Sequence, residues 1–134
     1  MKHGETTYNG LKQLPALWLR YLLLGLLAEK IVQHLVVTLA FAFNWADIRA
    51  TVVVNPKLLM ISGAVVALLF AVSLWGMMRQ TKGVINLVIA LALFDIVGEF
   101  VVQGTMRITL TVSFLVAILL LVLALFERQL GGEK

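Results

Sequence analysis

Residues 91–103 read LALFDIVGEFVVQ, a run apolar enough to sit in lipid that nevertheless contains two acids and an amide at four-residue spacing. A charged side chain near the bilayer centre costs ~2.5 to 3.5 kcal/mol, so each one marks a candidate functional group that needs a partner. At about 100° per residue, Asp95, Glu99 and Gln103 drift slowly around one helix face. Because hydrocarbon offers no hydrogen bonds, we expect this face to point into a bundle of helices.

The composition of the whole chain is that of a membrane protein. Of its 134 residues, 61% are hydrophobic and the mean hydropathy is +1.00, whereas soluble domains are about 45–50% apolar. The absence of cysteine excludes disulfides, thiolate catalysis, iron–sulfur clusters and cysteine-type zinc sites. The net charge of +4 comes from Lys and Arg near the predicted helix ends, where they anchor to lipid headgroups, so we expect the bilayer and no nucleic acid as partner.

Four apolar runs predict an all-α integral membrane protein, a single domain built as a bundle of four transmembrane helices. The helices are expected over residues 14–43, 56–79, 84–104 and 107–128, after a polar N-terminal tail over residues 1–13. Pro15 fits the first turn of the first helix, and Asn55 followed by Pro56 is a helix-start signal. Residues 44–55 are expected to form a folded segment at the membrane interface.

The distribution of basic residues predicts the orientation. Seven Lys and Arg residues fall on one side of the predicted bundle and three on the other. The two sets are Lys2, Lys12, Arg20, Arg79, Lys82, Arg128 and Lys134, against Arg49, Lys57 and Arg107. By the positive-inside rule, both termini are cytoplasmic in a multi-pass protein of the cell membrane.

A second group of polar residues lies near the middle of the first predicted helix, and we expect it to contact the polar face of the third predicted helix. The seven predicted site residues are Glu29, Lys30, Gln33, His34, Asp95, Glu99 and Gln103. We expect an oxygen of Asp95 or Glu99 to lie within hydrogen-bond reach of a polar side chain of the first helix. Three intramembrane carboxylates against one ammonium leave a surplus of negative charge, so at least one carboxyl should be protonated near neutral pH, or a cation should lie among them.

A purely structural role is the alternative for this cluster. In that case Lys30 pairs with Asp95, His34 with Glu99, and Glu29 with Gln33, and the contacts merely hold the two helices together. Interhelical polar pairs in membranes average only ~0.6 kcal/mol, so such contacts would be a costly way to join helices that small residues can pack. That comparison favours a functional cluster.

Small residues and metal-ligand types also need an interpretation. In the second predicted helix Gly63, Ala67 and Ala71 recur every four residues and predict close packing. Gly25 and Gly98, each about one turn from an acid, are also expected to allow close packing, with a hinge near the site as the alternative. Asp95, Glu99 and His34 are legitimate metal ligands, but Glu29 and His34 point ~140° apart, unlike helical metal motifs. His34 is the one histidine within a predicted span, too few for the axial ligands of a haem unless two chains share it. We therefore expect no resident metal and no cofactor.

The plan of four short-looped helices with Glu29 in the first resembles the small multidrug resistance transporters in architecture. The chain departs from them through Lys30, His34, Asp95 and Glu99, and through a charge bias that argues against dual-topology insertion. The chain is also similar to the small phosphate-starvation-inducible membrane proteins in its size, its helix count and the apolar sequence AILLL of residues 117–121. Neither resemblance carries a specific motif, so no residue roles are transferred.

Three classes of function fit these observations. The preferred one is a proton-linked or cation-handling transporter or channel, because surplus acid lies at successive depths of the membrane. The second is a small intramembrane enzyme acting on a lipid or isoprenoid by carboxyl acid/base chemistry, and the third is an accessory subunit of a membrane complex. The ligand would be a small cation or a lipid-like molecule. Four helices enclose little volume, which favours a homodimer for the first class and a lipid-facing cleft for the second.

Overall fold

The structure is a computed structural model that describes the backbone of residues 3–103 and 112–131 and the side chains of residues 16–102 and 112–131. Its elements are α1 (His3–Phe43), the 3-10 helix η1 (Trp45–Thr51), α2 (Pro56–Met78), α3 (Val84–Gln103) and α4 (Val112–Gly131). All four α-helices contain a section long and apolar enough to cross a membrane: Ala16–Phe43, Pro56–Met78, Val84–Val102 and Val112–Gly131. The prediction of an all-α membrane bundle is confirmed.

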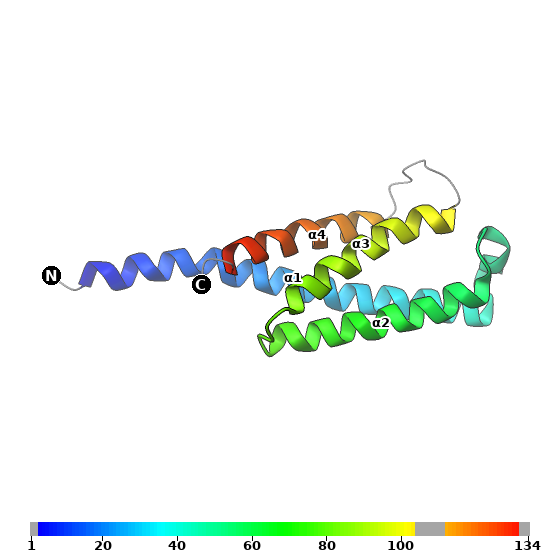
Figure 1. The fold of residues 1–134 in the computed structure, drawn as a ribbon, viewed down its shortest axis with the longest axis horizontal. Helices are drawn as coiled ribbons and strands as arrows, with labels where there is room; N and C mark the ends of the chain where they lie inside the picture. The colour runs from blue at the N-terminus through cyan, green and yellow to red at the C-terminus, as the bar shows by residue number, and fades with distance from the viewer. Residues whose placement is uncertain (1–2, 104–111, 132–134) are drawn as a thin grey trace.

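The helices are arranged so that α1 and α3 lie diagonally across the bundle. α1 packs along α2 and α4, and α3 packs along the same two helices. α1 begins and α4 ends at one end of the bundle, whereas η1 lies at the other, which we name the η1 end (Figure 1). α1 and α3 therefore run in the same direction, as expected. The cytoplasmic placement of the termini stays a prediction from the charge count.

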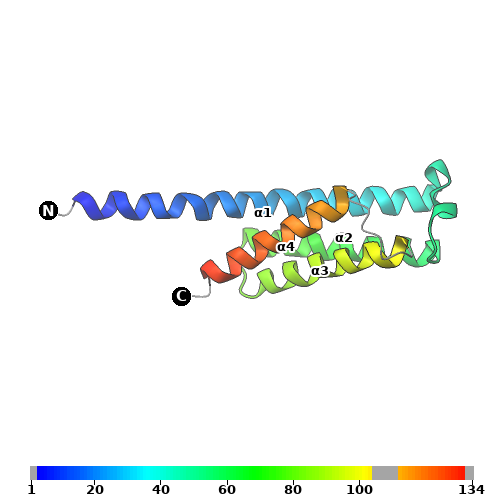
Figure 2. The same cartoon turned by 90° about the horizontal axis from the view of Figure 1, so that it is seen from above.

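α1 begins at His3, well before the predicted start at residue 14, so residues 3–13, expected to be a polar tail, are helical. Pro15 lies inside this helix rather than in its first turn. Each residue added to an existing helix gains a backbone hydrogen bond, whereas a proline inside the helix removes one such bond and costs stability only locally. The helix can therefore continue through Pro15 to His3. The 41 residues of α1 are roughly twice what a ~30 Å hydrocarbon core requires. Accordingly, its N-terminal part projects beyond the other helices (Figure 2).

The boundaries of the other helices follow local signals. Pro56 is the first residue of α2, and the Asn55 side chain accepts a hydrogen bond of 3.0 Å from the Lys57 backbone N–H, as the helix-start signal predicts. α2 ends at Met78, one residue earlier than predicted, and α4 continues to Gly131. α3 is helical to Gln103, and its predicted end at residue 104 lies outside the described residues. The predicted start of the fourth helix at Arg107 lies outside the described residues.

The segment between α1 and α2 is folded, as expected. Arg49 donates from Nε to the Phe41 carbonyl at 2.7 Å and from Nη2 to the Ala42 carbonyl at 2.8 Å, which satisfies two carbonyls at the end of α1. The chain turns through three residues with left-handed backbone angles, Asn44 (φ 51°), Ala46 (φ 51°) and Asp47 (φ 56°). Asn and Asp tolerate this conformation, but Ala46 has no polar side chain to compensate for it.

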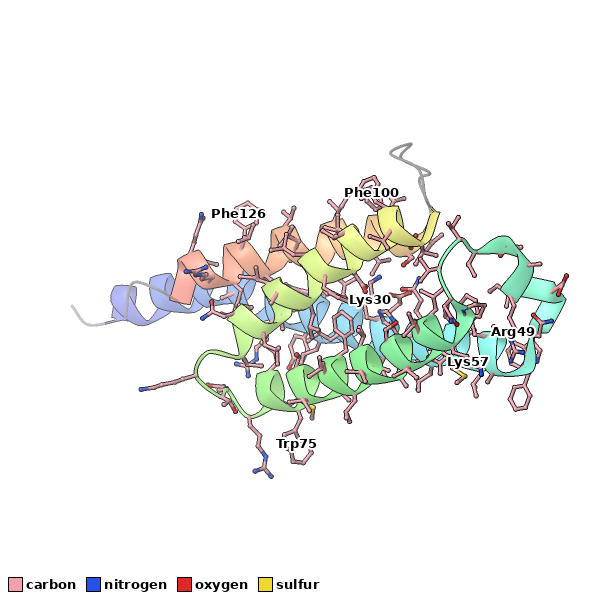
Figure 3. All side chains as sticks on the ribbon, turned by 45° about the vertical axis from the view of Figure 1, so that its right-hand side comes forward. Lys30, Arg49, Lys57, Trp75, Phe100 and Phe126 are labelled. Carbon is pink, nitrogen blue, oxygen red and sulfur yellow. The ribbon has the colours of Figure 1, made fainter. Side chains whose placement is uncertain are left out.

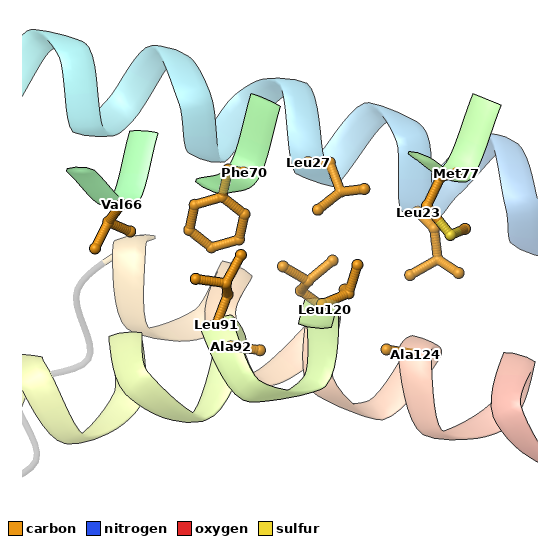
Figure 4. Close-up of a cluster of buried hydrophobic side chains, with 10 residues drawn as sticks. Leu23, Leu27, Val66, Phe70, Met77, Leu91, Ala92, Leu120 and Ala124 are labelled. Carbon is orange, nitrogen blue, oxygen red and sulfur yellow. The ribbon is translucent and has the colours of Figure 1, made fainter. Parts of the chain in front are cut away.

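Apolar side chains fill the half of the bundle away from η1. Leu23 and Leu27 of α1, Phe70 of α2, Leu91 of α3 and Leu120 of α4 meet there and are buried (Figure 4). These side chains form one buried cluster, which closes that half of the bundle. This core determines which end of the polar cluster is accessible.

Close helix packing occurs at one of the three predicted glycines. A Cβ at Gly63 would lie 2.6 Å from Thr38 Oγ1, so α1 and α2 approach each other closely there. Nothing lies within 4 Å of a Cβ built at Gly25 or Gly98. The prediction of close packing at those two positions is wrong, because their open sides do not face a neighbouring backbone.

Candidate functional site

The centre of the site is Lys30, a lysine of α1 that is fully buried inside the bundle (Figure 3). Its Nζ lies 2.8 Å from Asp95 Oδ2 and donates to Gln33 Oε1 at 2.9 Å. The same nitrogen donates to the backbone carbonyl of Ser113 at 3.0 Å and contacts its hydroxyl at 3.3 Å. Oxygens from α1, α3 and α4 thus surround the ammonium, which compensates for its removal from water.

Asp95 of α3 joins two nitrogens of α1. Its Oδ2 faces Lys30, and its Oδ1 lies 3.0 Å from His34 Nε2. Residues 30 and 34 are four apart, so their side chains stand one above the other on the same helix face and reach the two oxygens of one carboxylate. The prediction that a carboxyl oxygen of α3 reaches polar side chains of α1 is confirmed.

His34 departs from the structural hypothesis, which paired it with Glu99. Its ring hydrogen-bonds Asp95 and is stacked on the ring of Phe70 from α2, with centroids 5.5 Å apart and planes 25° apart. The stacking holds the imidazole plane, and the hydrogen bond sets its direction. His34 therefore has a defined orientation with one nitrogen committed to Asp95.

A cavity of about 390 Å³ reaches this cluster from the η1 end. It is lined by Gln33, His34, Val37, Phe41, Leu59, Ser62, Gly63, Val66, Phe94, Asp95, Val97, Gly98, Glu99, Val101, Val102 and Ser113. Along α1 and α3 these residues run from His34 and Asp95 toward the η1 end, so these two side chains lie at the inner end of the cavity. The apolar core around Phe70 and Leu91 lies beyond them. The cavity therefore meets the polar cluster on the side that faces the η1 end.

Five of the seven predicted site residues come together in this region: Lys30, Gln33, His34, Asp95 and Glu99. Glu99 lies one helical turn beyond Asp95 and lines the same cavity, half-buried. Glu29 lies instead in a groove of α1 with Val32 and Val36, where its Oε2 is buried without a hydrogen-bond partner. The side chain of Gln103, the last residue of α3, lies outside the described residues.

Sequence reasoning missed Ser113, which supplies two contacts to Lys30. The predicted fourth helix contains no acid or base between Arg107 and Glu127, and its many Leu and Val residues indicated packing and lipid contact alone. A serine close to the start of an apolar helix was the available signal. Its depth relative to Lys30 depends on how the helices are offset along the membrane normal, which residue spacing does not give.

The charges of the cluster offset each other. The Lys30 ammonium and the Asp95 carboxylate form a compensated pair, so the surplus acid expected from the sequence is not gathered around one ammonium. Glu29 is separate from the pair, and Glu99 lies along the cavity wall. Among the side chains that the structure describes, no group of three His, Asp or Glu residues is arranged to hold a metal ion.

Comparison of the chain with protein-family models, with curated proteins and with solved structures finds no match. The comparisons therefore add no shared motif and no shared fold to the architectural resemblances noted for the sequence. The chemistry of the site has to be argued from the geometry of Lys30, His34, Asp95 and the cavity beside them.

Proposed function

We propose that this chain is a proton-linked transporter of the cell membrane in which Asp95, between Lys30 and His34, exchanges protons or a cation. The observation that carries the proposal is the position of the Asp95 carboxylate. It lies between two nitrogens, at 2.8 Å and 3.0 Å, and lines a cavity of about 390 Å³ on the side toward the η1 end. Intramembrane ionisable residues that pair in this way mark ion and proton pathways in membrane proteins.

The ion pair couples proton occupancy to the helix arrangement. While Asp95 is ionised, it compensates the Lys30 charge and holds α3 to α1 across the bundle diagonal. Protonation of Asp95 leaves the ammonium with only the neutral acceptors of Gln33 and Ser113. In a low-dielectric interior this loss is large, so proton binding favours a different arrangement of the two helices. His34, in contact with the same carboxylate, is placed to pass the proton to or from the cavity.

The closed half of the bundle favours a carrier over an open channel. The cavity reaches Asp95 from the η1 end, but Leu27, Phe70 and Leu91 fill the interior on the other side. A channel needs a continuous polar path, whereas a carrier exposes its site to one side at a time. Under this proposal, the observed bundle is one of the two access states of such a carrier.

Reconstituted liposomes with a pH gradient test the proposal. We expect the parent protein to move protons, Asp95→Asn to abolish the flux, and the matched control Asp47→Asn, at an exposed position of η1, to retain it. Glu29→Gln should retain most of the flux, since Glu29 lies outside the cluster. Helix content and elution volume would show that each variant is folded. Absence of proton or cation flux in the folded parent, or full flux in Asp95→Asn, would disprove this function.

Chemistry on a lipid-like substrate is the second candidate, and a specific observation favours it. The carboxylate and imidazole of Asp95 and His34 are in contact at the end of a cavity with largely apolar walls, which suits acid/base chemistry on an amphiphile. The same reconstituted protein, incubated with membrane lipids and isoprenoids and analysed by mass spectrometry, distinguishes the two candidates. A product that is absent from Asp95→Asn would support the enzyme and not the transporter.

A further inference from the structure

Part of the cavity wall is formed by lipid-facing side chains of α3. The wall includes Phe94, Val97 and Val101 of α3, whose exposed fractions are 54%, 59% and 57%, and Leu59 of α2. These residues belong to sections of α2 and α3 that are long and apolar enough to cross the membrane. α2 and α3 lie close at the turn that joins them and diverge toward the η1 end (Figure 1). A molecule dissolved in the bilayer can therefore reach the cavity sideways.

The inner end of the cavity is polar but compensated. Asp95 already faces the Lys30 ammonium, and that ammonium is turned toward Asp95, Gln33 and Ser113 rather than being part of the cavity lining. No Lys or Arg is among the described residues that line the cavity. On the described part of the wall an anionic ligand would meet the carboxylates of Asp95 and Glu99 and no basic side chain. A permanent cation would have to cross hydrocarbon to enter from the side, at a high cost.

We propose that this cavity binds an uncharged amphiphile with a hydroxyl head group, a long-chain or isoprenoid alcohol, taken directly from the bilayer. The hydroxyl head lies at the inner end beside Asp95 and His34, and the hydrocarbon body lies between α2 and α3. The binding itself does not depend on the proposed transport, but the identification of this amphiphile as the transported species rests on that function.

The groups on the cavity wall match a hydroxyl in particular. A hydroxyl donates one hydrogen bond and accepts others. The cavity wall includes the Asp95 carboxylate, which can accept a hydrogen bond, and the His34 ring, whose Nδ1 is not the atom that contacts Asp95. The apolar side chains, such as Val37, Phe41 and Val66, surround the path from this end to the lipid. A volume of about 390 Å³ is in the range of small-molecule sites, roughly 300 to 1,000 Å³, so a longer chain would extend into the bilayer.

Two glycines provide a matched pair of variants for a test. Gly98 lines the cavity and Gly25 does not, and a Cβ at either position would meet nothing within 4 Å. Gly98→Leu should therefore fill part of the cavity without disturbing the packing, whereas Gly25→Leu adds the same side chain to an open part of α1. Both variants are expected to fold, because the Cβ added at either position meets nothing within 4 Å, and helix content and elution volume check this for each variant.

The experiment is photolabelling of the full chain in liposomes by a dodecanol whose chain carries a diazirine. We expect labelling within residues 59–66 and 94–102. Dodecanol should protect these residues at about tenfold lower concentration than dodecyltrimethylammonium or dodecanoate. Labelling should be lost in Gly98→Leu but not in Gly25→Leu. Stronger protection by the cation would show that the acidic wall selects the ligand and would overturn the proposal. Equal labelling of both leucine variants, or labelling spread over all lipid-facing residues, would also overturn it. Proton flux measured in parallel keeps the two hypotheses apart, since site-specific labelling without flux disproves transport but not binding.

Discussion

Lys30 Nζ lies 2.8 Å from Asp95 Oδ2, and this ion pair joins the two helices of the bundle that are diagonal neighbours. α1 and α3 each pack along α2 and α4, so the contact crosses the interior instead of running along a helix interface. A buried charge whose partner is removed is costly, whereas loss of both charges together is often tolerated. The predictions that follow begin with this pair.

Lys30→Met should lower the free energy of unfolding by roughly 3–5 kcal/mol, because it leaves the Asp95 carboxylate buried without its ammonium. The double variant Lys30→Met with Asp95→Leu should recover most of that loss, since no unpaired charge remains. Unfolding by increasing SDS in mixed micelles measures both. Lys57→Met, at an exposed position, is the control. Additive losses in the double variant would contradict the pairing.

His34→Phe and His34→Gln should separate packing from proton transfer. Phenylalanine keeps the stacking on Phe70 but has no hydrogen bond to Asp95, and glutamine keeps a donor but cannot carry a proton. Under the proposed function, both variants should fold and both should lose ~10²-fold or more of the proton flux, the lower end of what a positioned proton-transferring side chain contributes. Parental flux in His34→Gln would show that His34 only positions Asp95.

Gly63→Ala and Gly25→Ala should change stability in opposite directions. The added methyl group at residue 63 would lie 2.6 Å from Thr38 Oγ1, so we expect a loss of roughly 1–3 kcal/mol from overpacking between α1 and α2. At residue 25 the methyl group meets nothing within 4 Å, and the higher helix propensity of alanine should stabilise α1 by up to about 1 kcal/mol. Thr38→Ala should rescue Gly63→Ala. Thermal unfolding in detergent gives all three values, and no rescue would mean that the contact is elsewhere.

Ala46→Gly should stabilise the protein, because Ala46 has a left-handed backbone conformation with φ 51°. That conformation costs an L-residue with a Cβ roughly 1–2 kcal/mol, and glycine adopts it without the clash. Ala50→Gly, in the same 3-10 helix but without this conformation, should be neutral or destabilising. The two melting temperatures in the same detergent decide the point, and a lower value for Ala46→Gly than for Ala50→Gly would refute it.

Arg49→Lys should destabilise the end of α1 by about 1 kcal/mol, because the planar guanidinium donates to two carbonyls at once and an ammonium does not have that geometry. Hydrogen exchange at residues 41–44, measured by mass spectrometry, should increase locally. Arg128→Lys, at an exposed position of α4, should leave these amides unchanged. Unchanged exchange in Arg49→Lys would show that the two contacts contribute nothing to the end of α1.

The four membrane helices and the partners of Asp95 were predictable because they follow from local chemistry. Long apolar runs have no alternative in a bilayer to a helix that satisfies its own backbone. A carboxylate within such a run has to find a donor, and Lys30 and His34, one turn apart at a similar depth, were among the few candidates. The start of α2 was equally local, since Asn55 and Pro56 act within one turn.

The tertiary structure decided which of the candidate polar groups meet and which remain apart. Spacing along one helix gives relative directions, but the rotation of each helix about its axis depends on packing with its neighbours, for example the close approach of Gly63 to Thr38. That rotation directs Lys30 and His34 to Asp95 and leaves Glu29 in a groove of α1 outside the cluster. The offset between α1 and α4 brings Ser113 to Lys30, and the arrangement of α1, α2 and α3 leaves a cavity beside Asp95. Such relations depend on how whole side-chain surfaces fit together, so no single run of residues determines them.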